Sequence, residues 1–417
     1  MRTRRSRDLL AADARASDRR SLAGRTLAPF LAVLLVLVAA CATAPPRADA
    51  GPRSAQSVDA AAAQLTDALV AKAEPASGRR TLVIDPLIDR ASGAETAATR
   101  SIGAGIADQV RGRHPRLSVR PFTTAGLSER PIILLGSIAG VAAAGSVEPA
   151  VGKPRVYRVW AVLADLGSNR VLGREMVWGN ADDVDPRPTA AFRDAPVWTP
   201  DPVAAACIRT CSSAAGTPVD PVYLEALRAQ AVLADVVSAY DAGRYRQARA
   251  GYERALGLAG DRQLRAFSGH YMADRALGRR TEAERDFARL VDHGLGQGRL
   301  ATKLLFRPGS TMFWPDRAVS GAYPMWLRQI ARLAAARDAC LDISGHTSPT
   351  DPAENNERLS RARAERVRNL LAEEEPSVAA PAGVRGAAAQ ETIIGTGADD
   401  ASDALDRRVE FRPLACA

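Results

Sequence analysis

Apolar residues between positions 78 and 195 follow two different spacings. Four runs of apolar and β-branched residues are bounded by turn residues, and runs of this kind are typical of β-strands. These runs cover residues 81–88, 131–141, 157–166 and 171–178. The last two are joined by Gly-Ser-Asn, which predicts a hairpin. Between the first two runs, apolar residues recur at helical spacing over 96–110. The pattern therefore predicts a small α/β domain over residues 78–195.

Residues 223–296 show helical periodicity and an internal repeat. Gly243, Ala248 and Tyr252 recur 35 positions later as Gly278, Ala283 and Phe287. A helix–turn–helix unit with this period and small residues at helix contacts resembles the tetratricopeptide repeat. Two such repeats bury little surface alone, so we expect them to pack on a neighbouring domain. The pair has two interpretations, a concave face that binds a protein partner or a helical spacer.

The last section, residues 300–417, alternates between strand and helix patterns. Predicted strands and helices follow one another in the order strand, helix, strand, helix, strand, strand. The strands are expected at 304–306, 340–344, 392–394 and 408–411, and the helices at 325–337 and 356–372. This order predicts a C-terminal α/β sandwich.

The N-terminal 40 residues have the pattern of an export signal. An Arg-rich segment precedes an apolar run over 28–40, and these 13 residues are too short to cross a bilayer core of about 30 Å. The run ends in Val38-Ala39-Ala40-Cys41, which resembles the bacterial lipobox. The resemblance implies cleavage before Cys41 and a lipid on its thiol, and Ala42 in place of Asp implies the outer membrane. The alternative is an ordinary signal peptide with an incidental cysteine.

The segments between these parts are predicted to be connections. Residues 41–77 begin with a stretch rich in Pro, Ala and Gly and predict a tether with one short helix at 57–73. Residues 196–222 are rich in Asp, Pro and Ala and predict a linker. The whole chain is thus expected to be an α/β multidomain protein.

Net charge argues against nucleic acid as a partner. The chain carries a formal charge of +9, but residues 1–40 contain eight Arg and three Asp and so account for +5 of it. The remainder shows no basic stripe with interleaved aromatic residues.

The cysteines indicate an oxidising compartment. If Cys41 carries a lipid, an even number remains for disulfides. The remaining four are Cys207, Cys211, Cys340 and Cys416. A metal site at Cys207 and Cys211 would need two more ligands nearby, so we expect a local disulfide there and neither metal nor cofactor. Cys340 and Cys416 lie at the ends of predicted strands and predict a second disulfide.

Four sequence blocks in the C-terminal section carry a family resemblance. They occur in the order of the OmpA-like peptidoglycan-binding family, which this section resembles over about 115 residues. The blocks are Gly345-His346-Thr347-Ser348, Asn356-Glu357-Arg358-Leu359-Ser360-Arg361-Ala362-Arg363-Ala364, Gly395-Thr396-Gly397 and Arg407-Arg408-Val409-Glu410.

The resemblance implies a binding site for the peptidoglycan stem peptide. Arg363 takes the place of the Arg that holds the diaminopimelate carboxylate, and a guanidinium presents paired donors that suit a carboxylate. Asn356 begins the same helix, and Thr347 and Ser348 face the same pocket. Ser348 stands where the family has Asp, so the charge for the ligand's amino group is missing unless Asp351 supplies it.

These patterns predict an outer-membrane lipoprotein that binds peptidoglycan non-covalently and tethers membrane to wall from the periplasmic side. The alternative is an assembly or scaffold factor in which residues 78–296 recruit a protein partner of an envelope complex. We do not expect an enzyme, because the sequence offers no Ser/His/Asp, Cys/His or paired-carboxylate arrangement.

Overall fold

The computed structural model describes most of the chain after residue 53, and the statements below refer to that part. The described ranges are 54–73, 78–150, 154–198, 201–259, 264–348, 352–379, 383–390 and 406–415. The predicted signal segment, Cys41, Asp351, Cys416, the Gly395-Thr396-Gly397 block and the strand expected at 392–394 lie outside these ranges.

A six-stranded mixed sheet forms the first domain. Its strands are β1 (Arg80–Ile84), β2 (Ile88–Asp89), β3 (Leu117–Arg120), β4 (Ile132–Val141), β5 (Val156–Asp165) and β6 (Arg170–Asn180). The order is β3-β1-β4-β5-β6, with β2 paired to β4. β1 is parallel to β3 and β4, whereas β4, β5 and β6 are antiparallel. The predicted hairpin is confirmed as β5–β6, and the structure is a mixed α/β protein.

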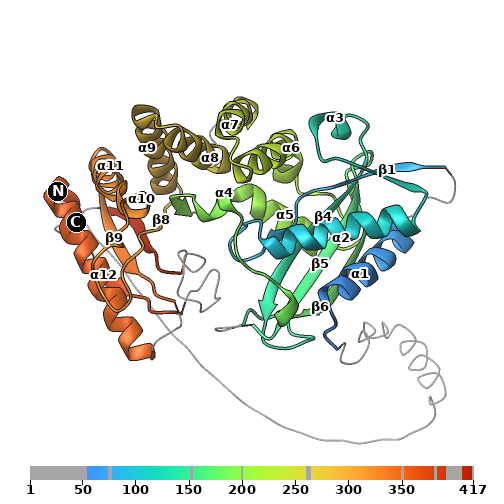
Figure 1. The fold of residues 1–417 in the computed structure, drawn as a ribbon, viewed down its shortest axis with the longest axis horizontal. Helices are drawn as coiled ribbons and strands as arrows, with labels where there is room; N and C mark the ends of the chain where they lie inside the picture. The colour runs from blue at the N-terminus through green and yellow to red at the C-terminus, as the bar shows by residue number, and fades with distance from the viewer. Residues whose placement is uncertain are drawn as a thin grey trace, which may run out of the picture. The chain divides into compact units, whose positions relative to one another are not determined.

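Alternate residues of the central strands face two different helical layers. Leu82, Ile132 and Leu134 lie in one hydrophobic cluster with α1 (Val58–Ala73) and α2 (Ala97–Arg113), which lie side by side (Figure 1). Their neighbours Val83 and Ile133 instead face α5 (Pro202–Ser212) and the start of α6 (Pro221–Asp241). This alternation follows from the period of two in a β-strand, and both faces of the sheet are covered.

Two segments expected to be connections form part of this domain. The tether prediction for 41–77 includes α1, whose Leu65 and Leu69 are fully buried against the sheet. The linker prediction for 196–222 includes α5, which packs on this sheet, and strand β7 (Val197–Trp198), which pairs with a strand of the second sheet instead. Asp201 accepts a hydrogen bond from the Val203 amide at 2.8 Å as an N-cap. Pro202 follows at the first turn, so residues that suggested a linker are start signals for a helix.

Four antiparallel helices form the middle section. α6 is followed by α7 (Tyr245–Ala259), α8 (Leu264–Ala276) and α9 (Arg280–Gly296), and neighbours in the chain pack on one another (Figure 1). The repeated glycines Gly243 and Gly278 both have a positive φ at the turns, +71° and +74°. The repeated aromatic residues Tyr252 and Phe287 are both buried. These equivalences fit the internal repeat, while tetratricopeptide membership stays a prediction.

The second sheet combines C-terminal strands with one strand from before the helices. It contains β7, β8 (Leu300–Thr302), β9 (Ala339–Gly345), β10 (Val384–Gly386) and β11 (Val409–Ala415) in the order β10-β9-β11-β8-β7. Only the β10–β9 pair is parallel. The first strand was expected at 304–306 but lies at 300–302. Phe306 instead forms an isolated bridge with Phe313.

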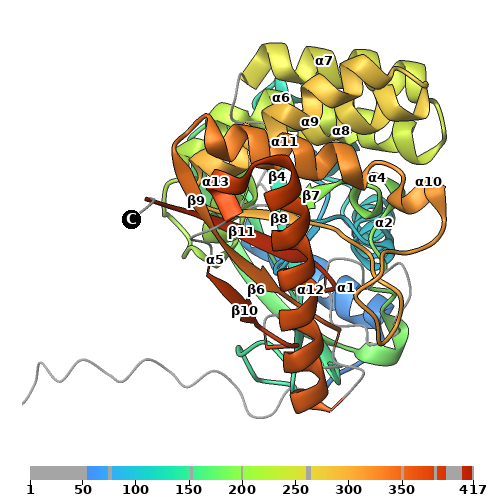
Figure 2. The ribbon, with the colours of Figure 1, turned by 90° about the vertical axis from the view of Figure 1, so that its left-hand side faces the viewer.

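Helices cover this sheet and join it to the middle section. α12 (Ala353–Glu374) lies in front of the sheet in Figure 2, followed by α13 (Pro376–Ala379). α11 (Tyr323–Ala335) packs on both α9 and α12. Phe287 of α9 stacks on Trp326 of α11, with ring centroids 5.4 Å apart. One hydrophobic cluster therefore runs through α6–α9, α11, α12 and the second sheet.

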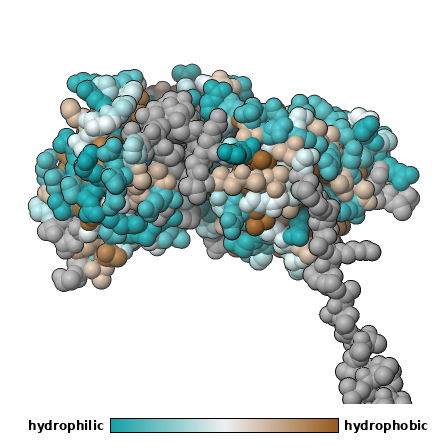
Figure 3. All heavy atoms as spheres, turned by 90° about the horizontal axis from the view of Figure 1, so that it is seen from below, coloured by the Kyte–Doolittle hydropathy of each residue, from teal (hydrophilic) through white to brown (hydrophobic). Residues whose placement is uncertain are grey.

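Four short helical turns complete the described elements. They are α3 (Thr124–Leu127), α4 (Ala190–Arg193), α10 (Arg317–Ser320) and a 3₁₀ turn at Ala181–Asp183. Hydrophilic residues dominate the face drawn in Figure 3. Among the described helices, none combines the length and the apolar character needed to cross a membrane.

The cysteines correct one prediction. Cys207 and Cys211 are free, buried thiols on one face of α5 and do not form the expected local disulfide. Residues four apart on a helix have Cβ atoms about 5–6 Å apart, beyond the roughly 3.5–4.5 Å of a disulfide. Cys340 is disulfide-bonded. Its register partner Leu414 lies two residues before Cys416, so the Cys340–Cys416 pairing stays the prediction.

Candidate functional site

The Gly-His-Thr block spans the last residue of β9, Gly345, and the start of the loop that follows. The His346 amide donates to the carbonyl oxygen of Arg408 at 3.0 Å, and the Thr347 amide donates to that of Ala388 at 2.9 Å. The loop is thus held on both sides by backbone hydrogen bonds. This fixes Thr347 and Ser348, which are both buried.

Two glycines let α12 lie directly against the strands. A Cβ atom on Gly345 would stand 2.0 Å from the carbonyl oxygen of Ser360, and one on Gly386 would stand 2.3 Å from that of Glu357. Only glycine permits this approach of helix and sheet. The glycine of the Gly-His-Thr block therefore has a packing role, which brings α12 next to the loop.

One stripe of α12 carries the polar residues of the site. Asn356, Ser360 and Arg363 follow at helical spacing and are each no more than 3% exposed. The Ser360 hydroxyl accepts a hydrogen bond from the Ala388 amide at 3.1 Å. Since the Ala388 carbonyl accepts from Thr347, this residue connects the α12 stripe to the loop. The structure thus brings Thr347, Asn356 and Arg363 into one region.

Arg363 is held by a turn that the sequence analysis did not identify. Its Nε donates to the carbonyl oxygen of Ser310 and its Nη2 to that of Arg307, both at 3.1 Å. The guanidinium carbon lies 4.9 Å from the ring centroid of Phe306. The turn closes where the Arg307 amide donates to the Met312 carbonyl at 2.9 Å. Pro-Gly-Ser between two phenylalanines was a turn signal that could have been used.

A buried ion cluster lies beneath the loop. Glu410 of β11 is fully buried and forms ion pairs at 2.7 Å with Arg299 and Arg408. Burial acts to raise its pKa, but the Arg299 hydrogen bond and the Arg408 charge lower the pKa to about 2. His346 lies 3.7 Å from Glu410, and burial together with the Arg408 charge lowers the His346 pKa to about 3. The Arg-Arg-Val-Glu block therefore supports the loop from inside.

The buried hydroxyl of Thr347 is a polar group of the site that the other described residues leave unsatisfied. Its Oγ1 has no hydrogen-bond partner among the described residues, and the same holds for both ring nitrogens of His346. Buried polar atoms are usually satisfied, so an orphaned hydroxyl beside the α12 stripe is available to a ligand.

A second polar cluster, which the sequence analysis did not single out, lies between α8 and α9. His270, Asp274 and Asp286 are buried with their ligand-type atoms within 4.8 Å of one another. His270 Nδ1 lies 2.6 Å from Asp286, while Arg249 donates to Asp274 at 2.6 Å. These contacts define an ion-pair network within the repeats, and the expectation of no metal stays a prediction.

Comparisons with known proteins give partial structural similarities. No protein-family model matches the chain, and no curated protein matches it. The chain is similar to a solved outer membrane protein of Borrelia burgdorferi B31, at 23% identity over 28% of this chain and 88% of that one, with a TM-score of 0.22.

Two further similar structures are MotB-related. A putative MotB-like protein from Desulfovibrio vulgaris matches at 20% identity over 33% of this chain and 98% of that one, with a TM-score of 0.23. The periplasmic domain of Helicobacter pylori MotB matches at 18% identity over 28% of this chain and 74% of that one, also with a TM-score of 0.23. At these TM-scores the argument for the site rests on the motifs and on the geometry above.

Proposed function

We propose that this chain binds peptidoglycan non-covalently, with Arg363 holding a carboxylate of the diaminopimelate stem peptide. The observation that carries the proposal is the position of Arg363, which lies buried on α12 about one turn after Ser360, the residue that packs against Gly345 of the block. A guanidinium stays charged when buried and recognises a carboxylate through paired N–H donors. Two backbone carbonyls and the Phe306 ring fix its plane, so little side-chain freedom is lost on binding.

The rest of the proposed site surrounds this cation. Asn356 and the orphaned Thr347 hydroxyl supply neutral hydrogen-bonding groups for the ligand backbone. Ser348 stands where a carboxylate would meet the ligand's amino group, and Asp351 is proposed to supply that charge. A serine accepts a hydrogen bond without neutralising an ammonium, so the site relies on Arg363 more than a site with both charges would.

The proposal is tested by co-sedimentation of the chain from residue 42 onward with purified diaminopimelate-type peptidoglycan. Arg363→Ala should reduce the bound fraction at least tenfold, because a charge-assisted hydrogen bond contributes about 1.5–3 kcal/mol. The matched control is Arg361→Ala on the same helix, where the side chain is 50% exposed. Ser348→Asp should strengthen binding. Equal retention of wild type and Arg363→Ala would overturn the assignment.

The remainder of the proposed function concerns location and chemistry. Lipidation of Cys41 would anchor the chain in the outer membrane, so that wall binding tethers the membrane to peptidoglycan. The lipid anchor is tested by mass spectrometry of the Cys41 peptide from native membranes. We propose no catalytic step, so incubation with peptidoglycan should release no soluble fragments.

A further inference from the structure

A groove away from the peptidoglycan site lies between the helical section and α10–α11. Its volume is about 540 Å³, within the roughly 300–1,000 Å³ of organic-ligand sites. α4, α6, α8, α10 and α11 contribute to it, together with the segment after β8. The residues on which the argument depends are Lys303, Arg275, Arg193, Asp194, Tyr323 and Trp326.

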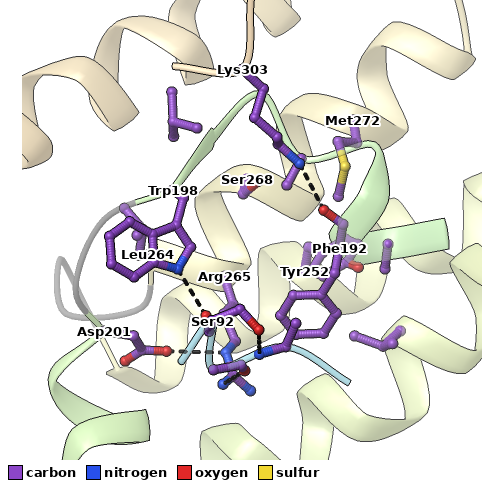
Figure 4. A pocket seen from close by; sticks show the side chains of 16 residues that line it. Ser92, Phe192, Trp198, Asp201, Tyr252, Leu264, Arg265, Ser268, Met272 and Lys303 are labelled. Carbon is purple, nitrogen blue, oxygen red and sulfur yellow. Dashed lines mark hydrogen bonds and ion pairs between the residues drawn. The ribbon is translucent and has the colours of Figure 1, made fainter. Parts of the chain in front are cut away.

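Lys303 is the unusual residue of this groove. Its ammonium donates to the backbone carbonyls of Phe192 at 2.8 Å and Arg193 at 2.9 Å, and Figure 4 shows the first of these two bonds. The residue is only 7% exposed. No carboxylate of the described residues forms an ion pair with it, and two carbonyls account for two of its three N–H donors.

The other charges of the groove offset the charge of Lys303 only in part, because Asp194 favours the charged amine while Arg193 opposes it. Asp194 is engaged by Arg193 at 2.9 Å and by the Tyr240 hydroxyl at 3.1 Å. Arg275 donates to the Ala318 carbonyl at 2.7 Å and has no ion pair with any described residue. The lining therefore has an excess of positive charge. Burying an ammonium without a counter-charge is costly, and an anion beside it removes that cost.

The walls of the groove offer apolar surface rather than hydrogen bonds. The Trp326 Nε1 donates to the Tyr271 hydroxyl at 2.8 Å, and the Tyr323 hydroxyl accepts from the Leu305 amide at 3.0 Å. The Trp326 N–H is therefore already used, and so is one acceptor position of each tyrosine hydroxyl. A peptide in the groove would bring backbone N–H and C=O groups that need partners, whereas an apolar body needs none.

We propose that this groove binds an organic monocarboxylate with an apolar body, its carboxylate against the Lys303 ammonium and its body along Tyr323 and Trp326. Burial lowers the pKa of Lys303 to about 7, and this supports the geometric argument, because a bound carboxylate would favour the charged amine. Lys303 also lines the small cavity of Figure 4, together with the buried Ser268, whose hydroxyl has no hydrogen-bond partner among the described residues. The proposal stands independently of wall binding.

The test is calorimetric titration of the chain from residue 42 onward with decanoate, decanol, acetate and inorganic phosphate. We expect decanoate to bind at least tenfold more tightly than the other three, because it alone joins a carboxylate to an apolar body. Lys303→Met should weaken decanoate binding at least tenfold. The matched control is Arg254→Gln, an exposed cation outside the groove, which should change nothing.

A second variant covers the case in which Lys303→Met fails to fold. Ala276 is exposed at the end of α8 and lines the groove, so Ala276→Trp should fill it and reduce binding without disturbing the core. Decanol or phosphate binding as tightly as decanoate would overturn the proposal, and so would absence of decanoate binding. Unchanged affinity in both Lys303→Met and Ala276→Trp would do the same. Peptidoglycan co-sedimentation of these variants should stay at the wild-type level.

Discussion

At the scale of single residues, the partners of each buried charge decide what that charge can do. Glu410 is held by two arginines, so its ionised form is stabilised inside the fold. Lys303 donates to two carbonyl oxygens and forms no ion pair with a described carboxylate, so its charge is offset only by the more distant Asp194. Arg363 combines two carbonyl contacts with an aromatic face, which orients its guanidinium. A structural ion cluster and two proposed binding residues thus differ in their contacts.

His346 should make the stability of the C-terminal sheet depend on pH. Its pKa is lowered to about 3 in the native protein, from an ordinary value of 6.5, chiefly by burial. Below about pH 6.5 the unfolded chain therefore binds a proton that the native protein does not. The stabilisation is complete above pH 6.5 and is lost progressively as the pH falls towards 3.

This dependence can be measured by thermal unfolding at pH 7 and pH 5. Acidification should lower the melting temperature of the wild type relative to that of His346→Gln, because the glutamine does not titrate. Burial raises the pKa of Asp85 to about 7, which acts in the opposite direction but equally in both proteins. Glu410 adds a similar loss only between about pH 4.5 and 2, so it leaves this comparison unaffected. An equal fall in both proteins would contradict the prediction.

The sequence predicted these residues unequally well. Asn356, Thr347 and Arg363 were predicted as site residues because they stand at fixed positions in a motif, and their binding role stays a proposal. The turn that holds Arg363 could not, because its contacts to Arg307 and Ser310 are made by backbone carbonyls, which any residue provides. The positive charge of Lys303 was visible in the sequence, but its burial depends on the packing of segments distant in the chain.

At the scale of elements, close contact between α12 and the second sheet positions the site. Gly345→Ala should disrupt it, because the new Cβ would stand 2.0 Å from a backbone oxygen of α12. We expect a loss of about 1–3 kcal/mol or more in the free energy of unfolding, together with weakened peptidoglycan binding. Gly105→Ala on α2 is the control, since nothing lies within 4 Å of its Cβ. It should be neutral or stabilise by about 0.5–1 kcal/mol, and both are measured by urea denaturation.

Element prediction from the sequence succeeded where periodicity was strong. The strands of the β5–β6 hairpin and helix α2 were found close to their observed bounds. α5 was missed because its Ala-rich sequence, which follows Asp201 and begins with Pro202, has the composition of a linker. Strand β7 was missed because two residues show no period, and it forms only by pairing with β8 about a hundred residues later.

At the scale of the described molecule, the second sheet includes a strand from outside the C-terminal segment of the sequence. Its edge strand β7 comes from before the helical section, and α9 of that section packs on α11. Described residues of α4, β7, α7–α9, the second half of α6 and the C-terminal elements thus share one hydrophobic cluster, whereas α5 and the start of α6 pack with the first sheet. The sequence pattern changes near residue 300, but the hydrophobic cluster continues across this boundary. Binding experiments should therefore use the chain from residue 42 onward.

This arrangement predicts that a substitution in the helical section weakens the C-terminal sheet. Phe287→Ala in α9 removes the ring stacked on Trp326 and should cost about 3–5 kcal/mol. Hydrogen exchange in β9 and β11 should accelerate accordingly. Ile106→Ala, equally buried but in the cluster of the first sheet, should leave exchange in β9 and β11 unchanged. If Phe287→Ala also left these strands protected, the helical section and the C-terminal sheet would be independent units, and the repeats could then act as the separate spacer that their sequence period allows.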